Sequence, residues 1–413
     1  MINDKSVGVG NQGRALSKSI TKGGGGKILV VTNQFHPDIG GIQRFSEEFA
    51  KFLSSESSCV HVCTLKTQFS PNNDYKYVLH NILVPISSIK NQILYFIINS
   101  LILLQLAVRL KPDLILSANY YPTSISNFFP SLILRKKLIV YTHGGEFMVK
   151  KKLFVRLLTK LTDKRIDFII FNSSYAEDIA RKNNFFANVK NWTVIHPVFP
   201  SLHFYKIIAL AKKERPSDNQ RNRPIRFLTV CRIRSKKGIH KVIKALYELN
   251  IKSRIRYTII GDGDIKYIQK LREMTYRYGL YDVVTFKGAL GGIPLFNEFV
   301  SSDIFVMPSY YVENGGIGDF ESFGIVYVEA LCARLVVIAS KESGGPDLKS
   351  FFKDQVILVN PYGSNSIKDG ILKAIDATRA SSSHYNLSED LTRYFDLIKS
   401  KWSKVITFAI ANH

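Results

Sequence analysis

The sequence predicts an α/β protein made of two doubly wound domains that face each other across a cleft. Short continuous apolar runs of strand length alternate with amphipathic segments of helix length, as in buried parallel sheets. This alternation begins twice, at Lys27 and again at Ile225. The chain has 413 residues, of which 46% are hydrophobic, so it is too long for one core and suits two domains.

The first series opens with a strand at 27–32, a loop containing Gly40 and Gly41, and a helix at 43–53. Strand, glycine-bearing loop and helix is the opening of a nucleotide-binding fold. Glycines at this point would let the backbone come close to a ligand phosphate. Further strands are expected at 60–65, 114–117, 138–141 and 168–172.

The apolar segment 93–110 has nearly the length of a membrane span, which needs about 20 residues. Polar residues interrupt it at Asn99, Ser100, Gln105 and Arg109, and a turn and a strand follow directly. We therefore expect a buried crossover helix here rather than a membrane span.

His143 follows the strand at 138–141, at a carboxyl end where open α/β sheets place their ligands. It is a candidate for substrate contact, and a structural role is the alternative. The segment 147–165 combines an apolar stripe with seven lysines and arginines. Such a helix can lie on an anionic membrane, or it can dock on the sheet with a solvated basic face.

Residues 206–224 are polar and are expected to form an interdomain linker. The second series then alternates strands with helices. Its strands are expected at 225–230, 257–260, 283–287, 304–307 and 336–339, and its helices at 237–249, 265–278, 295–301 and 323–333.

The stretch 313–347 holds a glycine-rich acidic loop followed by a helix, with Glu321 and Glu329 eight positions apart. Eight helical residues rise about 12 Å, close to the span from hexose to ribose in a nucleotide sugar. The free amides of such a helix start form an anion site. One element would thus hold a sugar, a diphosphate and a ribose.

The formal net charge of +24 implies an anionic partner, which is nucleic acid, an acidic membrane face or a phosphorylated ligand. A basic surface that serves only solubility is the alternative. The four cysteines lie in or beside apolar stretches, as core residues of a protein in a reducing compartment would. Residues 1–26 are polar and glycine-rich, unlike a secretory leader, and are expected to be a flexible tail.

Several motifs follow one another in a fixed order along the chain. They are the glycine loop at 37–43, Lys111-Pro112-Asp113, the histidine loop at 143–146, Arg232 with Lys237-Gly238, Gly261-Asp262-Gly263, Phe286-Lys287-Gly288, Asp303 to Ser309, and Glu321 with Glu329. Together they resemble the motifs of the retaining glycosyltransferases of family 4, whose fold is called GT-B. The residues around Glu321 are most similar to those of enzymes that mannosylate membrane lipids, and similar residues occur in transferases of cell-surface polysaccharide assembly.

The resemblance implies an N-terminal acceptor domain at 27–205, a donor domain at 225–390, and a helix at 391–413 that crosses back onto the first domain and carries Trp402. It also implies a role for each motif residue. Arg232 and Lys237 would hold the diphosphate, Glu321 the donor sugar and Glu329 the ribose. The remaining expected donor contacts are the backbone at Gly40, Gly41, Gly261, Phe323, Gly324 and Ile325, together with His143 near the reacting carbon.

The resemblance further implies a nucleotide diphosphate sugar as donor and no metal or other cofactor. Asp262-Gly263-Asp264 has the form of a metal-binding motif, but its place after a strand favours a turn. The implied reaction moves a hexose, of mannose, glucose or GlcNAc type, to a cell-envelope glycan or glycolipid. We expect a cytoplasmic location, with peripheral contact between helix 147–165 and the inner face of the cytoplasmic membrane.

Three other functions stay open at this point. A catalytically weakened GT-B protein and a sugar-nucleotide epimerase share the fold. A basic nucleic-acid-binding protein would account for the charge, but the chain has no nucleic-acid reader motif. The sequence also departs from the family pattern at three places. The family has glycine and proline where this chain has Arg334 and Val336, and it has glycine where this chain has Cys231. The family's Pro-Asn-Gly-Val is replaced by His196-Pro197-Val198. Arginine is a poor substitute for the glycine that ends a helix in a left-handed cap.

Overall fold

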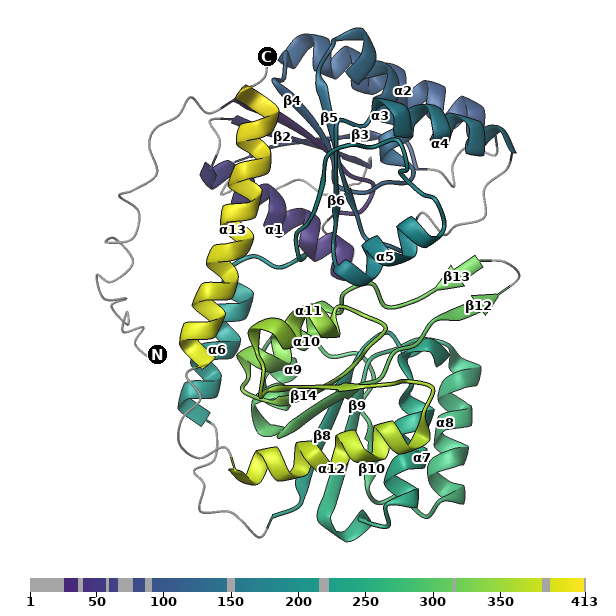
Figure 1. Ribbon diagram of the computed structural model, residues 1–413, viewed down its shortest axis with the longest axis vertical. Coiled ribbons are helices and arrows are strands. Elements are labelled where there is room, and N and C mark those ends of the chain that lie inside the picture. The colour runs from purple at the N-terminus through teal and green to yellow at the C-terminus, as the bar shows by residue number, and fades with distance from the viewer. Residues whose placement is uncertain are drawn as a thin grey trace, which may run out of the picture.

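Two parallel sheets form from the apolar runs, one in each half of the chain (Figure 1). The computed structural model describes residues 26–35, 40–56, 59–65, 77–85, 91–146, 153–214, 223–314, 317–380 and 387–411. The expected flexible tail, the first part of the glycine loop at 36–39 and the residues 147–152 lie outside these ranges.

The N-terminal sheet has seven strands in the order β3-β2-β1-β4-β5-β6-β7, all of them parallel. Its strands are β1 Lys27–Val31, β2 Cys59–Leu65, β3 Val78–Leu83, β4 Leu114–Ser117, β5 Lys137–Thr142, β6 Phe168–Phe171 and β7 Trp192–Val194. Its helices are α1 Gly41–Glu56, α2 Gln92–Leu110, α3 Thr123–Ile133, α4 Leu153–Arg165, α5 Ser174–Lys182 and α6 Leu202–Glu214.

The C-terminal sheet has six parallel strands in the order β10-β9-β8-β11-β14-β15. Its strands are β8 Ile225–Val230, β9 Ile255–Ile260, β10 Val284–Phe286, β11 Ile304–Met307, β14 Val336–Ser340 and β15 Val356–Val359. A separate antiparallel hairpin consists of β12 Val312–Asn314 and β13 Ile317–Asp319. The helices that follow are α7 Ile239–Glu248, α8 Ile265–Arg277, α9 Gly292–Ser301, α10 Ile325–Cys332, α11 Gly345–Phe351, α12 Ser364–Ala380 and α13 Leu387–Ala411, with short 3-10 turns at Ser235–Lys237 and Lys252–Arg254.

The expected linker at 206–224 is wrong in its first part, because residues 202–214 form helix α6. Phe204, Ile207 and Ala211 recur at helical spacing and are buried, which stabilises the helix. Helix α6 packs on α9 and α10 of the second sheet. The part of the expected linker that lies in α6, residues 206–214, is therefore a packed helix.

Helix α2 is a crossover helix between β3 and β4, as expected, but it is only partly buried. By length and composition it is the one described helix apolar enough to cross a membrane, and 33% of its apolar window is buried inside the protein. Its inner face packs on the sheet and on α3, whereas large apolar side chains on its outer face are exposed. A right-handed crossover places α2, α3 and α4 together on one face of the sheet, with α1 on the other (Figure 1).

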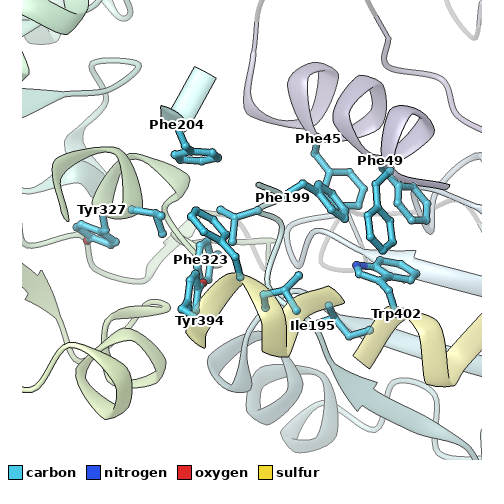
Figure 2. Packing of buried hydrophobic residues seen from close by; sticks show 14 of the residues in the cluster. Phe45, Phe49, Ile195, Phe199, Phe204, Phe323, Tyr327, Tyr394 and Trp402 are labelled. Carbon is cyan, nitrogen blue, oxygen red and sulfur yellow. The ribbon is translucent and has the colours of Figure 1, made fainter. Parts of the chain in front are cut away.

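Helix α13 joins the two halves of the molecule (Figure 1). Near its start, Tyr394 packs against Phe351 and Phe352 of the second domain. Further along, Trp402 is fully buried, with its ring centroid 4.4 Å from that of Phe49 on α1. Figure 2 shows this aromatic core, in which side chains of α1 and α13 face each other.

The end of α10 shows how the helix is capped with Arg334 in the place of the family's glycine. Its φ is 64°, the left-handed conformation that the family's glycine would adopt. The Leu335 amide donates to the Ala330 carbonyl at 3.0 Å, and the Arg334 amide donates to Leu331 at 2.9 Å. The helix thus ends in a Schellman-type cap although an arginine occupies the strained position.

Candidate active site

A cleft of about 1440 Å³ lies between the two sheets, at the carboxyl ends of their strands. Gly40, Gly41 and His143 line it from the first domain. From the second domain come Arg232, Lys237, Gly261, Glu321, Phe323, Gly324, Ile325 and Glu329. The structure therefore brings every sequence-predicted site residue to one cavity.

The loop after β8 supplies the cations. Arg232 is exposed in the cleft and makes no hydrogen bond or ion pair with another described residue. Lys237 follows one 3-10 turn later and forms an ion pair with Glu321. Gly238 then has φ 73°, and a Cβ there would lie 2.4 Å from the Pro308 carbonyl oxygen. This close approach requires glycine and holds the cationic loop against the strand end beside it.

Glu321 and Lys237 are ionised together. Burial would raise the pKa of Glu321, but Lys237 and Lys236 outweigh it and hold that pKa below its usual range. Burial likewise lowers the pKa of Lys237, but the Glu321 carboxylate raises it above its usual range. The neighbouring Cys231 thiol is buried, which raises its pKa to about 12. That thiol is therefore protonated at neutral pH and is no nucleophile.

Helix α10 begins between the two glutamates. Gly324 is its N-cap with φ 88°, and a Cβ there would lie 2.5 Å from the Tyr327 ring. The amides of Ile325 and Val326 precede the first hydrogen bond of the helix, from the Tyr327 amide to the Gly324 carbonyl at 3.0 Å, and both residues line the cleft. Across the cleft, a Cβ built on Gly41 would lie 3.8 Å from Ile325 Cδ1. The glycine loop of one domain thus closes over the helix start of the other.

Glu329 is held by two side chains from other helices. His203 of α6 lies with its Nε2 2.6 Å from Glu329 Oε1, and Arg44 of α1 forms an ion pair with the same oxygen. Burial would raise the pKa of Glu329, but His203 and Arg44 outweigh it and keep the carboxyl ionised. Arg44 Nη1 also lies 3.0 Å from His203 Nε2, so the three side chains form one cluster. Because an ionised carboxylate only accepts, an Nε2–H of His203 is the group that donates to Glu329.

His143 is a neutral imidazole with a defined tautomer. Burial lowers its pKa to about 4, although the hydrogen bond to Ala118 acts in the other direction. Nε2 lies 2.9 Å from the Ala118 carbonyl oxygen, so Nε2 donates and Nδ1 keeps a lone pair. Phe45 packs edge-on against the ring, with the centroids 4.9 Å apart. Nδ1 can therefore accept a hydrogen bond from a ligand hydroxyl.

The two domains also touch beside Glu321. Ser322 donates to Asn172 Oδ1 at 2.5 Å, and Ser173 donates to the Ser322 carbonyl at 2.6 Å. Gly144 has φ 90°, and a Cβ there would lie 2.3 Å from Ser322 Oγ. The loop that carries Glu321 is thereby held against the histidine loop.

Gly261 and the Asp262-Gly263-Asp264 turn have structural explanations. A Cβ on Gly261 would lie 1.9 Å from the Cys231 carbonyl oxygen, so the glycine allows two strand-end loops to touch. Asp264 is the N-cap of α8 and accepts from the Tyr267 amide at 3.2 Å. Within the described ranges, no group of three His, Cys, Asp or Glu side chains is placed to hold a metal ion.

Sequence reasoning missed Arg44, His203, Asn172 and Ser322. The first two lie 285 and 126 residues from Glu329, so no local spacing connects them to it. Asn172 offers a weak signal, since it directly follows the strand β6 and therefore lies at the ligand edge of the sheet. Ser322 stands beside Glu321 within the motif.

Two family models together match most of the chain. Residues 39–199 match Glycosyltransferase Family 4, and residues 211–391 match Glycosyl transferases group 1. Members of this family use a nucleotide-sugar donor and generally require no metal ion.

Named relatives and solved structures agree with these matches. A GDP-mannose-dependent monoacylated alpha-(1-6)-phosphatidylinositol monomannoside mannosyltransferase from Corynebacterium glutamicum is 25% identical over 78% of this chain and 82% of its own. The GDP-mannose-dependent alpha-(1-6)-phosphatidylinositol monomannoside mannosyltransferase of Mycobacterium tuberculosis is 24% identical over 86% and 90%. HepE from Anabaena in complex with UDP superposes with a TM-score of 0.68 at 19% identity, covering 92% and 99%. With its GT-B fold and these matches, the chain belongs to glycosyltransferase family 4, the retaining glycosyltransferases that transfer a sugar from a nucleotide-sugar donor.

Proposed function

We propose that the protein transfers a hexose from a nucleotide diphosphate sugar to a cell-envelope glycan or glycolipid. The arrangement around α10 carries this proposal, because two ionised carboxylates flank the start of that helix in the cleft, with the exposed Arg232 beside it. The named mannosyltransferase relatives act on phosphatidylinositol mannosides, which supports a lipid-linked acceptor for this chain as well.

Each residue then has a role set by its charge. The diphosphate lies at the first-turn amides of α10, opposite Gly40 and Gly41, and pairs with Arg232. Lys237 adds positive charge where negative charge grows on the leaving phosphate. Its pairing with Glu321 also keeps that carboxylate ionised, so Glu321 accepts hydrogen bonds from the donor sugar hydroxyls.

The other end of the donor meets Glu329, which accepts from the ribose hydroxyls. The Glu329 oxygen bound by His203 and Arg44 is occupied, so the second oxygen serves the ribose. His143 accepts a sugar hydroxyl at Nδ1 near the reacting carbon. Retention follows from front-face attack, in which the leaving phosphate takes the proton of the acceptor hydroxyl, as the family resemblance implies.

Each domain has its own role in this reaction. Residues 27–205 present the acceptor, residues 225–390 hold the donor, and α13 connects the two units. We place the protein in the cytoplasm, in peripheral contact with the inner face of the membrane through segment 147–165. The described part of that segment, α4, exposes Arg156, Lys160 and Lys164.

A thermal-shift panel of GDP-, UDP- and ADP-sugars would identify the donor class. Transfer of the labelled hexose to an envelope extract would then be measured for the wild type, Arg232→Ala, Glu329→Ala and Arg379→Ala. Arg379 is exposed on α12 and serves as the control. We expect the first two variants to lose transfer and the control to keep it. Equal turnover in all four proteins contradicts the proposal, and epimer formed from donor alone indicates an epimerase.

A further inference from the structure

Ten large apolar side chains are exposed on three neighbouring helices of the first domain, each with a relative exposure between 41% and 61%. We call this set the apolar helix face. It consists of Ile93, Leu94, Ile97, Leu101 and Val108 on α2, Phe129, Leu132 and Ile133 on α3, and Leu157 and Leu161 on α4.

The set forms one continuous surface. On α2 the five members fall within an arc of about 100° at the helical period of 3.6 residues. Helix α2 packs on α3, and α3 packs on α4, so their outer stripes adjoin. All three helices lie on the sheet face opposite α1 (Figure 1). An exposed apolar patch of this extent on a folded domain marks an interaction surface.

The charge around the apolar helix face is almost entirely positive. Arg109, Arg135, Arg156, Lys160 and Lys164 are exposed at its margins. The only acidic residue in the three helices is Asp163, and it points inward, accepting from the Tyr120 hydroxyl at 2.8 Å. The cleft has other cations of its own, since Arg44, Lys236 and Lys237 line it and pair with its carboxylates.

The apolar helix face adjoins the cleft. Helix α2 starts after the carboxyl end of β3, so its first turns lie at the sheet edge that borders the cleft. Tyr121 lines the cleft and packs against Phe96 of α2, with ring centroids 6.2 Å apart. The outward stripe beside Phe96 begins with Ile93 and Ile97.

We propose that the apolar helix face docks the protein on an anionic phospholipid bilayer, with its apolar side chains inserted and the marginal cations paired with lipid phosphates. Docking in this orientation brings the cleft edge at Tyr121 next to the headgroups. The inference deepens the proposed function, since it extends the membrane contact from α4 to α2 and α3. The docking itself does not depend on which sugar is transferred.

The positive charge around the apolar helix face favours a bilayer over a second copy of the chain or a nucleic acid. In a symmetric pair of copies, two basic margins would face each other, which opposes association. Nucleic acid would satisfy the cations but leave the apolar side chains exposed. A bilayer with acidic headgroups meets both the apolar area and the charge.

Co-sedimentation of the full chain with vesicles tests the binding. The probes are phosphatidylglycerol–phosphatidylcholine vesicles and pure phosphatidylcholine vesicles, at low and high salt. We expect binding to the anionic vesicles that weakens with salt. Leu101→Asp should lower the partition coefficient at least tenfold, whereas Leu372→Asp on α12 should not, although Leu372 is also exposed. A Lys160→Glu variant should bind about fivefold or more weakly.

Insertion is tested with a tryptophan probe. In Leu101→Trp, brominated phosphatidylglycerol vesicles should quench fluorescence beyond the background of the two native tryptophans, and in Leu372→Trp they should not.

Equal vesicle binding by the wild type and Leu101→Asp overturns docking, as does a Leu101→Asp effect confined to the monomer–dimer balance in light scattering. A thermal shift of each variant on addition of the donor sugar nucleotide confirms that the variant is folded. It also separates the docking proposal from the proposed function. Donor binding without vesicle binding refutes the docking alone, and vesicle binding without donor binding refutes the proposed function alone.

Discussion

Glu329 is positioned by His203 and Arg44, which come from helices that sequence spacing does not connect to it. We predict that His203→Ala weakens binding of the nucleoside diphosphate about tenfold, because the loss of one hydrogen bond to a charged group costs about 1.5 kcal/mol. His203→Gln restores an N–H donor and should recover part of the affinity. Calorimetric titration measures both. If the glutamine variant binds no better than the alanine variant, His203 does not act through its hydrogen bond.

His143 predicts a pH dependence of stability. Burial lowers its pKa in the folded protein to about 4, whereas an unfolded histidine has a pKa of about 6.5. Between these values the unfolded chain binds a proton that the folded chain excludes, so stability is full above pH 6.5 and falls as the pH drops toward 4. From pH 7 to pH 5 the wild type should lose about 2 kcal/mol more than His143→Asn. Urea unfolding at the two pH values measures this, and equal losses would contradict it.

At the scale of elements, the end of α10 stores strain at Arg334. Its left-handed conformation costs a non-glycine residue about 1–2 kcal/mol. A glycine avoids this cost, but it also makes the unfolded chain more flexible, which offsets part of the gain in stability. Arg334→Gly should therefore raise the free energy of unfolding by about 0.5–1 kcal/mol. Arg379→Gly, in the last turn of α12, should lower it by a similar amount. Thermal unfolding of the two variants gives the sign of each change in stability, and a destabilised Arg334→Gly would contradict this prediction.

The elements that could be predicted from sequence are those with an uninterrupted apolar run. Strands β4 and β11 have the bounds expected, because buried parallel strands leave no polar break inside the run. Strand β8 also has the expected bounds, although Arg226 and Thr229 lie within its run. Helix α6 was missed because it ends in the charged residues Lys212, Lys213 and Glu214 and runs into a polar segment. Its packing against α9 and α10 is a tertiary contact that the sequence alone does not show. The hairpin β12–β13 was expected as a loop, since glycines obscure strand periodicity.

The same division holds for the site. Glu321, Glu329, Arg232 and Lys237 are recognisable because each belongs to a local motif on one loop or helix. Their partners follow from tertiary structure, where α1 and α6 bring side chains from distant parts of the chain to one carboxylate. The lone pair of His143 likewise depends on a carbonyl of the neighbouring strand end, which no sequence pattern reveals.

At the scale of the whole molecule, α13 packs on the second domain through Tyr394 and on the first through Trp402. Its ring is fully buried among Phe49, Tyr141 and Phe199, and Figure 2 shows it against α1. Trp402→Ala should lower the free energy of unfolding by about 3–5 kcal/mol. Trp402→Phe should cost less, because it keeps most of the apolar area and removes an indole N–H that has no partner among the described residues. Urea unfolding compares the two, and similar losses would contradict this account of the core.

The central claim is that one cleft binds a nucleotide sugar with its ribose on Glu329. A double-mutant cycle tests it most directly, using calorimetric dissociation constants for the ribonucleoside diphosphate of the donor and its 2′,3′-dideoxy analogue. For the wild type, removal of the hydroxyls should weaken binding about tenfold to a hundredfold. For Glu329→Ala it should have almost no further effect. The claim would be contradicted if removal of the hydroxyls weakened binding to Glu329→Ala as much as it weakens binding to the wild type, because the two losses of binding free energy would then simply add.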